Sequence, residues 1–142
     1  MFALTWCLLL YISARCYAFD LQVNETMTWP EAFKFCRSKE MELVAIDSEE
    51  ENAALAEHGI KTGFFAPFNG AWTSGCFQPF QGDYVWFSTG TVVNYKKWAA
   101  SHPLVAAADH CITFYPPDPQ WIEAPTSIYR PVICESPIYI HN

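Results

Sequence analysis

The stretch from Lys96 to Glu135, KKWAASHPLVAAADHCITFYPPDPQWIEAPTSIYRPVICE, decides the fold. It holds three short apolar runs, which are anchored by Cys111, Trp121 and Cys134. Each run has the length and composition of a β-strand, and connectors rich in Pro, Asp, Ser or Ala separate the runs. The runs predict a small sheet. The long connector between Trp98 and Cys111 is expected to lie on top of this sheet, where a binding site would be.

The first 18 residues predict a cleaved signal peptide. Residues 6–12 form an apolar run, and Cys16-Tyr17-Ala18 is a small-x-small pattern that suits signal peptidase. An uncleaved membrane anchor is the alternative, but the run is shorter than the ~20 residues that a bilayer span needs. We therefore expect cleavage after Ala18, which leaves a single domain from residue 19 to residue 142.

The composition predicts an acidic, secreted domain with an aromatic core. Aromatic residues make up 17% of the chain, so most of the rings must be inside. Once Arg15 is removed with the leader, seven Lys and Arg residues remain against fifteen Asp and Glu, a formal charge of −8. This balance argues against nucleic acid and anionic membrane surfaces as partners, because both need a basic face. No later apolar run is long enough for membrane insertion.

Four cysteines remain after the leader, namely Cys36, Cys76, Cys111 and Cys134. An even number in a secreted chain implies disulfides, and four cysteines leave three pairings open. The sequon Asn24-Glu25-Thr26 predicts N-glycosylation at Asn24, which agrees with passage through the secretory pathway.

Two helices are predicted before the main set of strands. Residues 28–31, Thr-Trp-Pro-Glu, fit a capping box, and the apolar period that follows predicts a helix to about Lys39. Residues 48–51, Ser-Glu-Glu-Glu, fit a second capping box, and Gly59 is expected to end that helix in the left-handed C′ position. The acidic cluster from Asp47 to Glu51 has the composition of a cation site, but a helix N-terminus stabilises carboxylates without any metal.

Short strands account for most of the remaining chain. Residues 19–23 alternate apolar and polar side chains, as an edge strand should, and further strands are expected at residues 71–75, 84–87 and 92–93. Turn residues at Gly70 and at Gly82-Asp83 separate them. Helices first and strands afterwards predict an α+β domain.

The order of these landmarks resembles the C-type lectin-like domain. The resemblance covers essentially the whole mature chain and implies two helices packed on short antiparallel sheets, with a long loop region. The segments that carry it are Trp29-Pro30-Glu31-Ala32 with Cys36, Leu43 to Asn52, Ala71-Trp72-Thr73-Ser74-Gly75, Val85-Trp86 with Gly90, Trp98 with Pro103, Cys111, Trp121 and Val132-Ile133-Cys134-Glu135.

The resemblance implies one disulfide, between Cys36 and Cys134, which closes almost the whole domain and is worth about 4–5 kcal/mol by loop-closure entropy. In this family a second bridge joins the Cys111 position to a cysteine five residues after the strand tryptophan, where this chain has Thr126. Cys76 is an additional cysteine. In the implied sheet its strand runs antiparallel to the Cys111 strand, so we predict a Cys76–Cys111 bond.

The family's calcium site is the larger departure. Sugar-binding members hold calcium with Glu-Pro-Asn or Gln-Pro-Asp in the long loop, a later acidic residue, and an Asn-Asp pair after the strand tryptophan. Here these places hold His102-Pro103-Leu104, Asp109 and Ile122-Glu123. Calcium needs six to eight oxygen ligands, and only Asp109 and Glu123 offer carboxylates. We therefore expect no calcium cofactor.

Two other chemistries use the same residues. His102, Asp109, His110 and Glu123 suit a zinc site by residue type, although their spacing matches no metal-ligand motif and solvated loop histidines are the simpler interpretation. Cys111 beside His110 has the composition of a thiol nucleophile with its base, but a disulfide is the commoner state of such a cysteine in a secreted chain.

The loop and its aromatic neighbours offer a different kind of surface. Residues 103–108, Pro-Leu-Val-Ala-Ala-Ala, would form an apolar patch of the kind that marks a protein interface if they are exposed. Aromatic rings near the loop would stack on a sugar or a peptide, or would belong to the core: Tyr95, Trp98, Phe114 and Tyr115. Four tryptophans are interpreted as core: Trp72, Trp86, Trp98 and Trp121.

The sequence thus predicts a secreted binding module and not an enzyme, because no nucleophile, base and oxyanion hole are assembled. The main hypothesis is recognition of a protein or glycan partner without calcium, through the loop from Ala99 to Asp109 and the residues His102, Pro103, Asp109 and Glu123. A calcium-dependent carbohydrate-binding lectin with a divergent site is the alternative. An enzyme or metal protein using His102 and His110 is the third hypothesis. Nothing in the sequence defines an oligomeric state.

Overall fold

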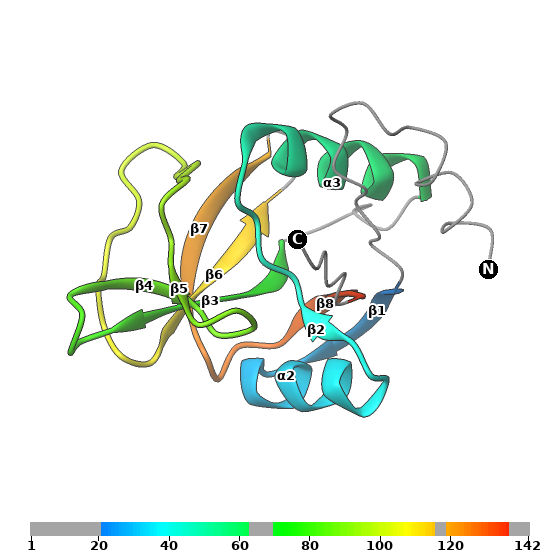
Figure 1. Cartoon of the computed structure of the whole chain (residues 1–142), viewed down its shortest axis with the longest axis horizontal. Coiled ribbons are helices and arrows are strands. Elements are labelled where there is room, and N and C mark those ends of the chain that lie inside the picture. Colours follow the sequence, from blue (N-terminus) through cyan, green and yellow to red (C-terminus); the bar gives the residue numbers. More distant parts are fainter. Residues whose placement is uncertain (1–20, 63–69, 116–118, 137–142) are drawn as a thin grey trace, which may run out of the picture.

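The computed structural model describes residues 21–62, 70–115 and 119–136, and it has the α+β architecture that the sequence predicts. Two helices, α2 (Trp29–Ser38) and α3 (Glu49–Thr62), lie on opposite sides of the strands (Figure 1). The leader predicted over residues 1–18 lies outside the described residues. No helix in the described ranges is long and apolar enough to cross a membrane. The strands are β1 (Leu21–Met27), β2 (Glu42–Leu43), β3 (Ala71–Gln78), β4 (Asp83–Trp86), β5 (Thr91–Val92), β6 (His110–Tyr115), β7 (Gln120–Pro125) and β8 (Arg130–Glu135).

Helix α2 begins with the capping box that its sequence predicts. The Thr28 N–H donates to Glu31 Oε2 at 2.9 Å, and the Thr28 side chain accepts in return from the helix backbone. Ala32 and Cys36 are fully buried on the inward face of the helix. The indole Nε1 of Trp29 donates to the carbonyl oxygen of Thr73 at 2.8 Å, which fixes the start of the helix against β3. The helix ends at Ser38, one residue from the predicted end.

Helix α3 begins as predicted but ends later. Ser48 Oγ accepts the Glu51 N–H at 3.1 Å, while the Glu51 carboxylate accepts the N–H of Asp47. The predicted end at Gly59 is wrong, because the helix continues to Thr62.

The reason is that Gly59 belongs to the buried face of α3. The buried positions of the helix are Asn52, Leu55, Ala56 and Gly59, which recur at i, i+3, i+4 and i+7. A glycine within a helix costs only about 1 kcal/mol relative to alanine, so packing of this face outweighs the local preference.

All eight described strands belong to one mixed sheet. Its main path is β1–β8–β3–β4–β5, while β2 pairs with β8, and β6 pairs with both β3 and β7. Strand β3 is antiparallel to β4 and β6 and parallel to β8. Strand β1 pairs with β8 from Leu21 opposite Cys134, so the predicted edge strand is present but extends to Met27, beyond the sequon. Residues 19 and 20 of that prediction lie outside the described ranges.

The core has two parts, one on each helix-bearing side of the sheet. The part next to α3 contains Trp86 and Trp121, whose ring centroids lie 5.6 Å apart in an edge-to-face arrangement. The part next to α2 contains Trp72 and both disulfides. Three of the four predicted core tryptophans are fully buried, while Trp98 packs against the edge of the core and is only partly buried.

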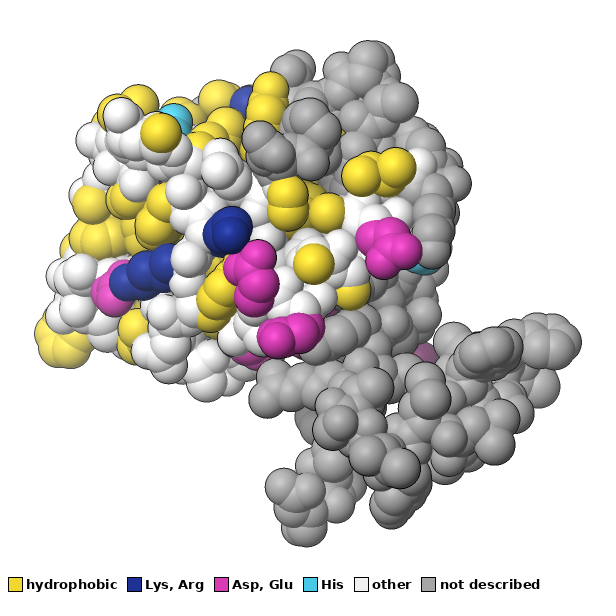
Figure 2. Space-filling model, turned by 90° about the horizontal axis from the view of Figure 1, so that it is seen from above, with side chains coloured by type: hydrophobic (Ala, Val, Ile, Leu, Met, Phe, Trp, Pro, Cys, Tyr) yellow, Lys and Arg dark blue, Asp and Glu magenta, His cyan; other side chains and the backbone are white. Residues whose placement is uncertain are grey.

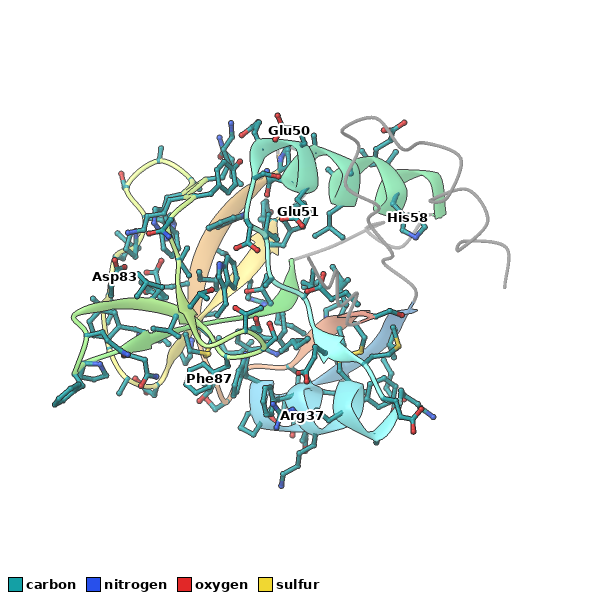
Figure 3. All side chains as sticks on the ribbon, viewed as in Figure 1. Arg37, Glu50, Glu51, His58, Asp83 and Phe87 are labelled. Carbon is teal, nitrogen blue, oxygen red and sulfur yellow. A yellow bond between two sulfur atoms is a disulfide. The ribbon has the colours of Figure 1, made fainter. Side chains whose placement is uncertain are left out.

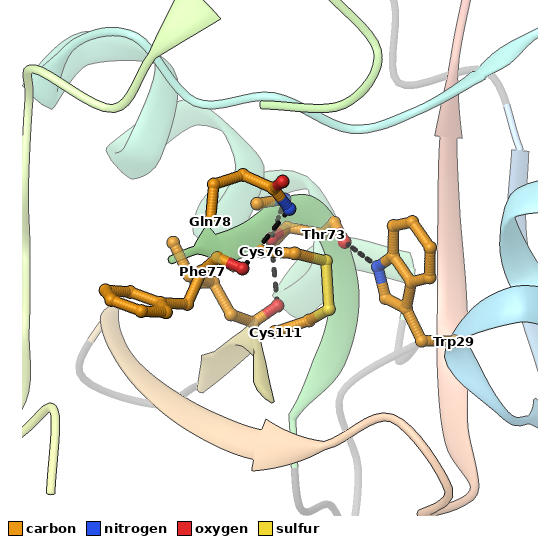
Figure 4. Close-up of a disulfide and its surroundings, with 8 residues drawn as sticks. Trp29, Thr73, Cys76, Phe77, Gln78 and Cys111 are labelled. Carbon is orange, nitrogen blue, oxygen red and sulfur yellow. Dashed lines mark hydrogen bonds between the residues drawn. A yellow bond between two sulfur atoms is a disulfide. The ribbon is translucent and has the colours of Figure 1, made fainter. Parts of the chain in front are cut away.

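The two disulfides fasten different parts of the fold. Cys36 on α2 is bonded to Cys134 on β8, with a Cα–Cα distance of 5.4 Å. Cys76 on β3 is bonded to Cys111 on β6, with a Cα–Cα distance of 4.0 Å, and the two residues lie directly opposite each other in the ladder (Figure 4). The second bond joins the two ends of the segment between Cys76 and Cys111, which contains β4, β5 and the long loop.

Candidate ligand-binding site

The long loop from Ala99 to Asp109 is anchored where it begins and where it ends. At its beginning Trp98 forms a parallel bridge with Trp121 of β7, and the Ala99 N–H donates to the Trp121 carbonyl at 2.9 Å. At its end the Asp109 carbonyl accepts the Thr126 N–H at 2.8 Å, directly before β6 begins. The beginning of the loop is therefore held by β7, and its end is held by Thr126, the residue that follows β7.

The middle of the loop is held by the carboxylate of Glu123, which projects from β7. This side chain is only 5% exposed. Its Oε2 lies 2.8 Å from Nδ1 of His102, and its Oε1 accepts the backbone N–H groups of Leu104 at 2.6 Å and Val105 at 3.1 Å. We call this arrangement the Glu123 clamp: the Glu123 carboxylate with the His102 ring and the N–H groups of Leu104 and Val105.

The clamp keeps Glu123 ionised. Burial of the carboxylate acts to raise its pKa, but the hydrogen bonds from the His102 side chain and from the N–H groups of Glu123 itself, Leu104 and Val105 hold the pKa below its usual value. An ionised carboxylate only accepts hydrogen bonds. The His102 Nδ1 atom must therefore carry the proton and donate it.

Because the backbone of the loop faces the clamp, its apolar side chains are exposed. Leu104 is 68% exposed and Val105 46% exposed. The Val105 carbonyl accepts a hydrogen bond from Tyr84 Oη on β4 at 3.3 Å, which ties the tip to the sheet. Burial, with further contributions from Glu123 and Asp83, raises the pKa of Tyr84 to about 12, so this hydroxyl keeps its proton. The apolar patch predicted from the loop composition is exposed in the structure.

The lysines next to the loop are paired within the domain. Lys96 lies 3.1 Å from Asp83 of β4, which is labelled in Figure 3. Lys97 lies 3.2 Å from Glu49 of α3, which also accepts the hydroxyl of Tyr95. Figure 2 shows dark blue Lys or Arg groups against magenta Asp or Glu groups, with hydrophobic side chains gathered toward the left of the view.

The structure brings together three of the four candidate site residues. His102 and Glu123 are in direct contact, and the exposed Pro103 lies between His102 and the tip. Asp109 is at the other end of the loop, where its backbone contacts Thr126. The backbone donors of Leu104 and Val105 and the hydroxyl of Tyr84 were missed, because a backbone N–H has no sequence signature and Tyr84 is distant in the chain.

These residues offer few oxygens to a calcium ion. The positions of His102, Leu104 and Ile122 offer no side-chain oxygen, and the carboxylate of Glu123 is already occupied by donors from its own chain. Calcium prefers six to eight oxygen ligands. Within the described ranges, no group of three or more His, Cys, Asp or Glu side chains is arranged to hold a metal, so the four-residue zinc hypothesis has no support in the geometry.

A disulfide decides the thiol hypothesis. Cys111 is bonded to Cys76, so the thiol nucleophile considered beside His110 is wrong. The described residues thus form an α+β scaffold with a clamped loop that displays apolar side chains.

Comparison with known proteins gives the family. Residues 25–136 match the model of the C-type lectin domain, and the chain belongs to this family of non-enzymatic binding domains. It is 26% identical over 89 residues to C-type lectin mosGCTL-7 of Aedes aegypti, which covers 63% of this chain and 59% of that protein. The chain thus spans less than two thirds of that relative's length.

Two further proteins extend the comparison. Salivary C-type lectin 1 of Aedes albopictus is 28% identical over 119 residues, which covers 79% of this chain and 78% of that protein. Human lithostathine has the same fold, with a TM-score of 0.72 over 87% of this chain and 94% of that chain at 20% identity. The resemblance inferred from the sequence is therefore confirmed.

Proposed function

We propose that this carbohydrate-recognition-type domain is secreted and binds a protein or glycan partner through the loop from Ala99 to Asp109, without a calcium ion. The observation that carries the proposal is the Glu123 clamp. It uses the carboxylate that would be needed for calcium, and it turns the side chains of Leu104 and Val105 outward.

Secretion is supported by the disulfides and by the salivary relative. Two disulfides are typical of an oxidising compartment. The predicted leader of residues 1–18 supplies the route, and a relative of similar length is named a salivary lectin. Expression in insect cells, followed by N-terminal sequencing of protein from the medium, should find Phe19 as the first residue. Retention in the cell membrane would contradict this part of the proposal.

The partner is to be sought on glycan and protein arrays probed with calcium and, separately, with EDTA. We expect the same partners to bind in both conditions. If EDTA abolishes binding to sugars, the alternative of a calcium-dependent lectin with a divergent site replaces the proposal.

A charged substitution at the loop tip then tests which surface is used. Leu104→Asp should weaken binding by about 10- to 100-fold, because burial of a leucine side chain in an interface is worth roughly 1.5–3 kcal/mol. Ile60→Asp is the matched control, since Ile60 is 62% exposed on α3, away from the loop. Equal binding by the two variants would place the binding surface elsewhere.

A further inference from the structure

We infer that this chain supplies its own replacement for the calcium ion of the loop: His102 and Glu123 are positioning residues that fix the loop tip without any metal. The inference rests on the proposed function in two respects, since both place the binding surface on this loop and both leave calcium out of it. It begins from the disagreement between the family's calcium ligands and the residues present at these positions.

The first argument is the hydrogen-bonding capacity of Glu123. A carboxylate has about four lone-pair sites. Three of them are occupied by donors of the chain, namely the His102 ring and the N–H groups of Leu104 and Val105. A cation at Glu123 would have to share the carboxylate with these donors, and the side chains of His102, Leu104 and Ile122 offer it no further oxygen.

The second argument is the shielding of the pair. The Glu123 side chain is 5% exposed and the His102 side chain 22% exposed, so neither group is freely solvated. A buried carboxylate that loses its donor is left with an uncompensated charge, which costs far more than the loss of a solvated ion pair. Breaking the clamp should therefore destabilise the protein more than breaking a surface ion pair such as Lys97 with Glu49.

The third argument is the backbone conformation before the clamp. Ser101 has a φ of +67°, in the left-handed region that is unfavourable for a residue with a side chain. The His102 N–H closes this turn on the Ala99 carbonyl at 3.0 Å. The turn directs the His102 ring to Glu123, so the contacts of the clamp offset the strain of the turn.

The experiment measures hydrogen exchange of the Leu104 and Val105 amides, which needs no partner. In the unmodified protein we expect both amides to be protected equally with millimolar calcium and with EDTA. Glu123→Ala should raise their exchange by at least about tenfold, since it leaves both amides without the carboxylate oxygen that accepts them. Glu49→Ala removes an exposed carboxylate and is the matched control, with no expected change at the loop.

The His102 variants keep the inference testable if Glu123→Ala does not fold. His102→Ala should raise the exchange of both amides, while His102→Gln retains an N–H donor and should restore part of the protection. Amides of β3 and β6 serve as the internal reference for an intact fold. Protection that increases with calcium, or protection that is unchanged in His102→Ala, would overturn the inference, whereas failed partner binding alone would overturn only the proposed function.

Discussion

Replacement of Glu135 by glutamine should change the pH dependence of stability more than any exposed substitution. Glu135 ends β8 and its Oε1 accepts the N–H of Ala45 at 3.1 Å. Burial raises the pKa of its carboxyl to about 8, and the Ala45 bond opposes this only in part. The negative charges of Glu51, Asp47 and Glu42 raise the pKa further. Glutamine keeps the acceptor for Ala45 without the charge.

The sign and size of the effect follow from proton linkage. In the unfolded chain the pKa of this carboxyl returns to about 4.5, so between pH 4.5 and pH 8 the native state binds more protons than the unfolded state. The free energy of unfolding of the unmodified protein therefore falls as the pH rises through this window. At about 1.4 kcal/mol per pKa unit, the loss amounts to roughly 3–5 kcal/mol over the whole window.

The assay is urea unfolding followed by tryptophan fluorescence at several pH values from 4.5 to 8. Glu135→Gln should match the unmodified protein at the acidic end and exceed its stability progressively toward pH 8. Glu25→Gln removes a carboxylate from an exposed position of β1 without losing the sequon, and its curve should parallel that of the unmodified protein. Parallel curves for Glu135→Gln and the unmodified protein would refute the reasoning.

Three further substitutions test the packing of the scaffold, again by urea unfolding. Removal of the Cys76–Cys111 bond by double replacement with serine should cost about 4 kcal/mol, from a sequence separation of 35 residues; non-reducing peptide mapping should first recover the linked peptides, and free thiols would contradict the pairing. Gly75→Ala should cost roughly 1–3 kcal/mol, because its Cβ would lie 2.7 and 2.8 Å from side-chain atoms of β6 and β4; an unchanged midpoint would show that these side chains yield. Asn52→Ala should cost about 1–3 kcal/mol by leaving the buried Trp121 Nε1 without its acceptor, now 2.8 Å away; a cost well below 1 kcal/mol would show that another acceptor takes its place.

The fold was predictable where its signals are local. The capping box at Thr28 and the apolar period of α2 lie within one short segment, and the helix follows them closely. The end of α3 was not predictable in this way, because the burial of Gly59 depends on contacts with distant parts of the chain. The Cys76–Cys111 bond lies between these two cases. Its prediction needed only the relative direction of two strands, which the family resemblance supplied.

The site was predictable in its residue types but not in its arrangement. His102 and Glu123 were candidates because they replace calcium ligands of the family, yet nothing in the sequence indicated that they bind each other. Asp109 was grouped with them for the same reason, although the structure places it at the base of the loop. Backbone donors complete the clamp, and such donors become visible only when the loop conformation is known.

The two losses in this sequence, a cysteine and the calcium oxygens, fall on the same loop, and the structure compensates for both. Thr126 stands where the family has its cysteine. The Thr126 N–H bonds the Asp109 carbonyl at 2.8 Å, and its carbonyl accepts the N–H of Trp29 at 3.0 Å, so hydrogen bonds to the loop and to α2 hold this position. The Cys76–Cys111 bond closes the base of the loop from the opposite side, on β3. With both ends fixed, only the tip needs an internal anchor, and one buried carboxylate with its donors is sufficient to hold it.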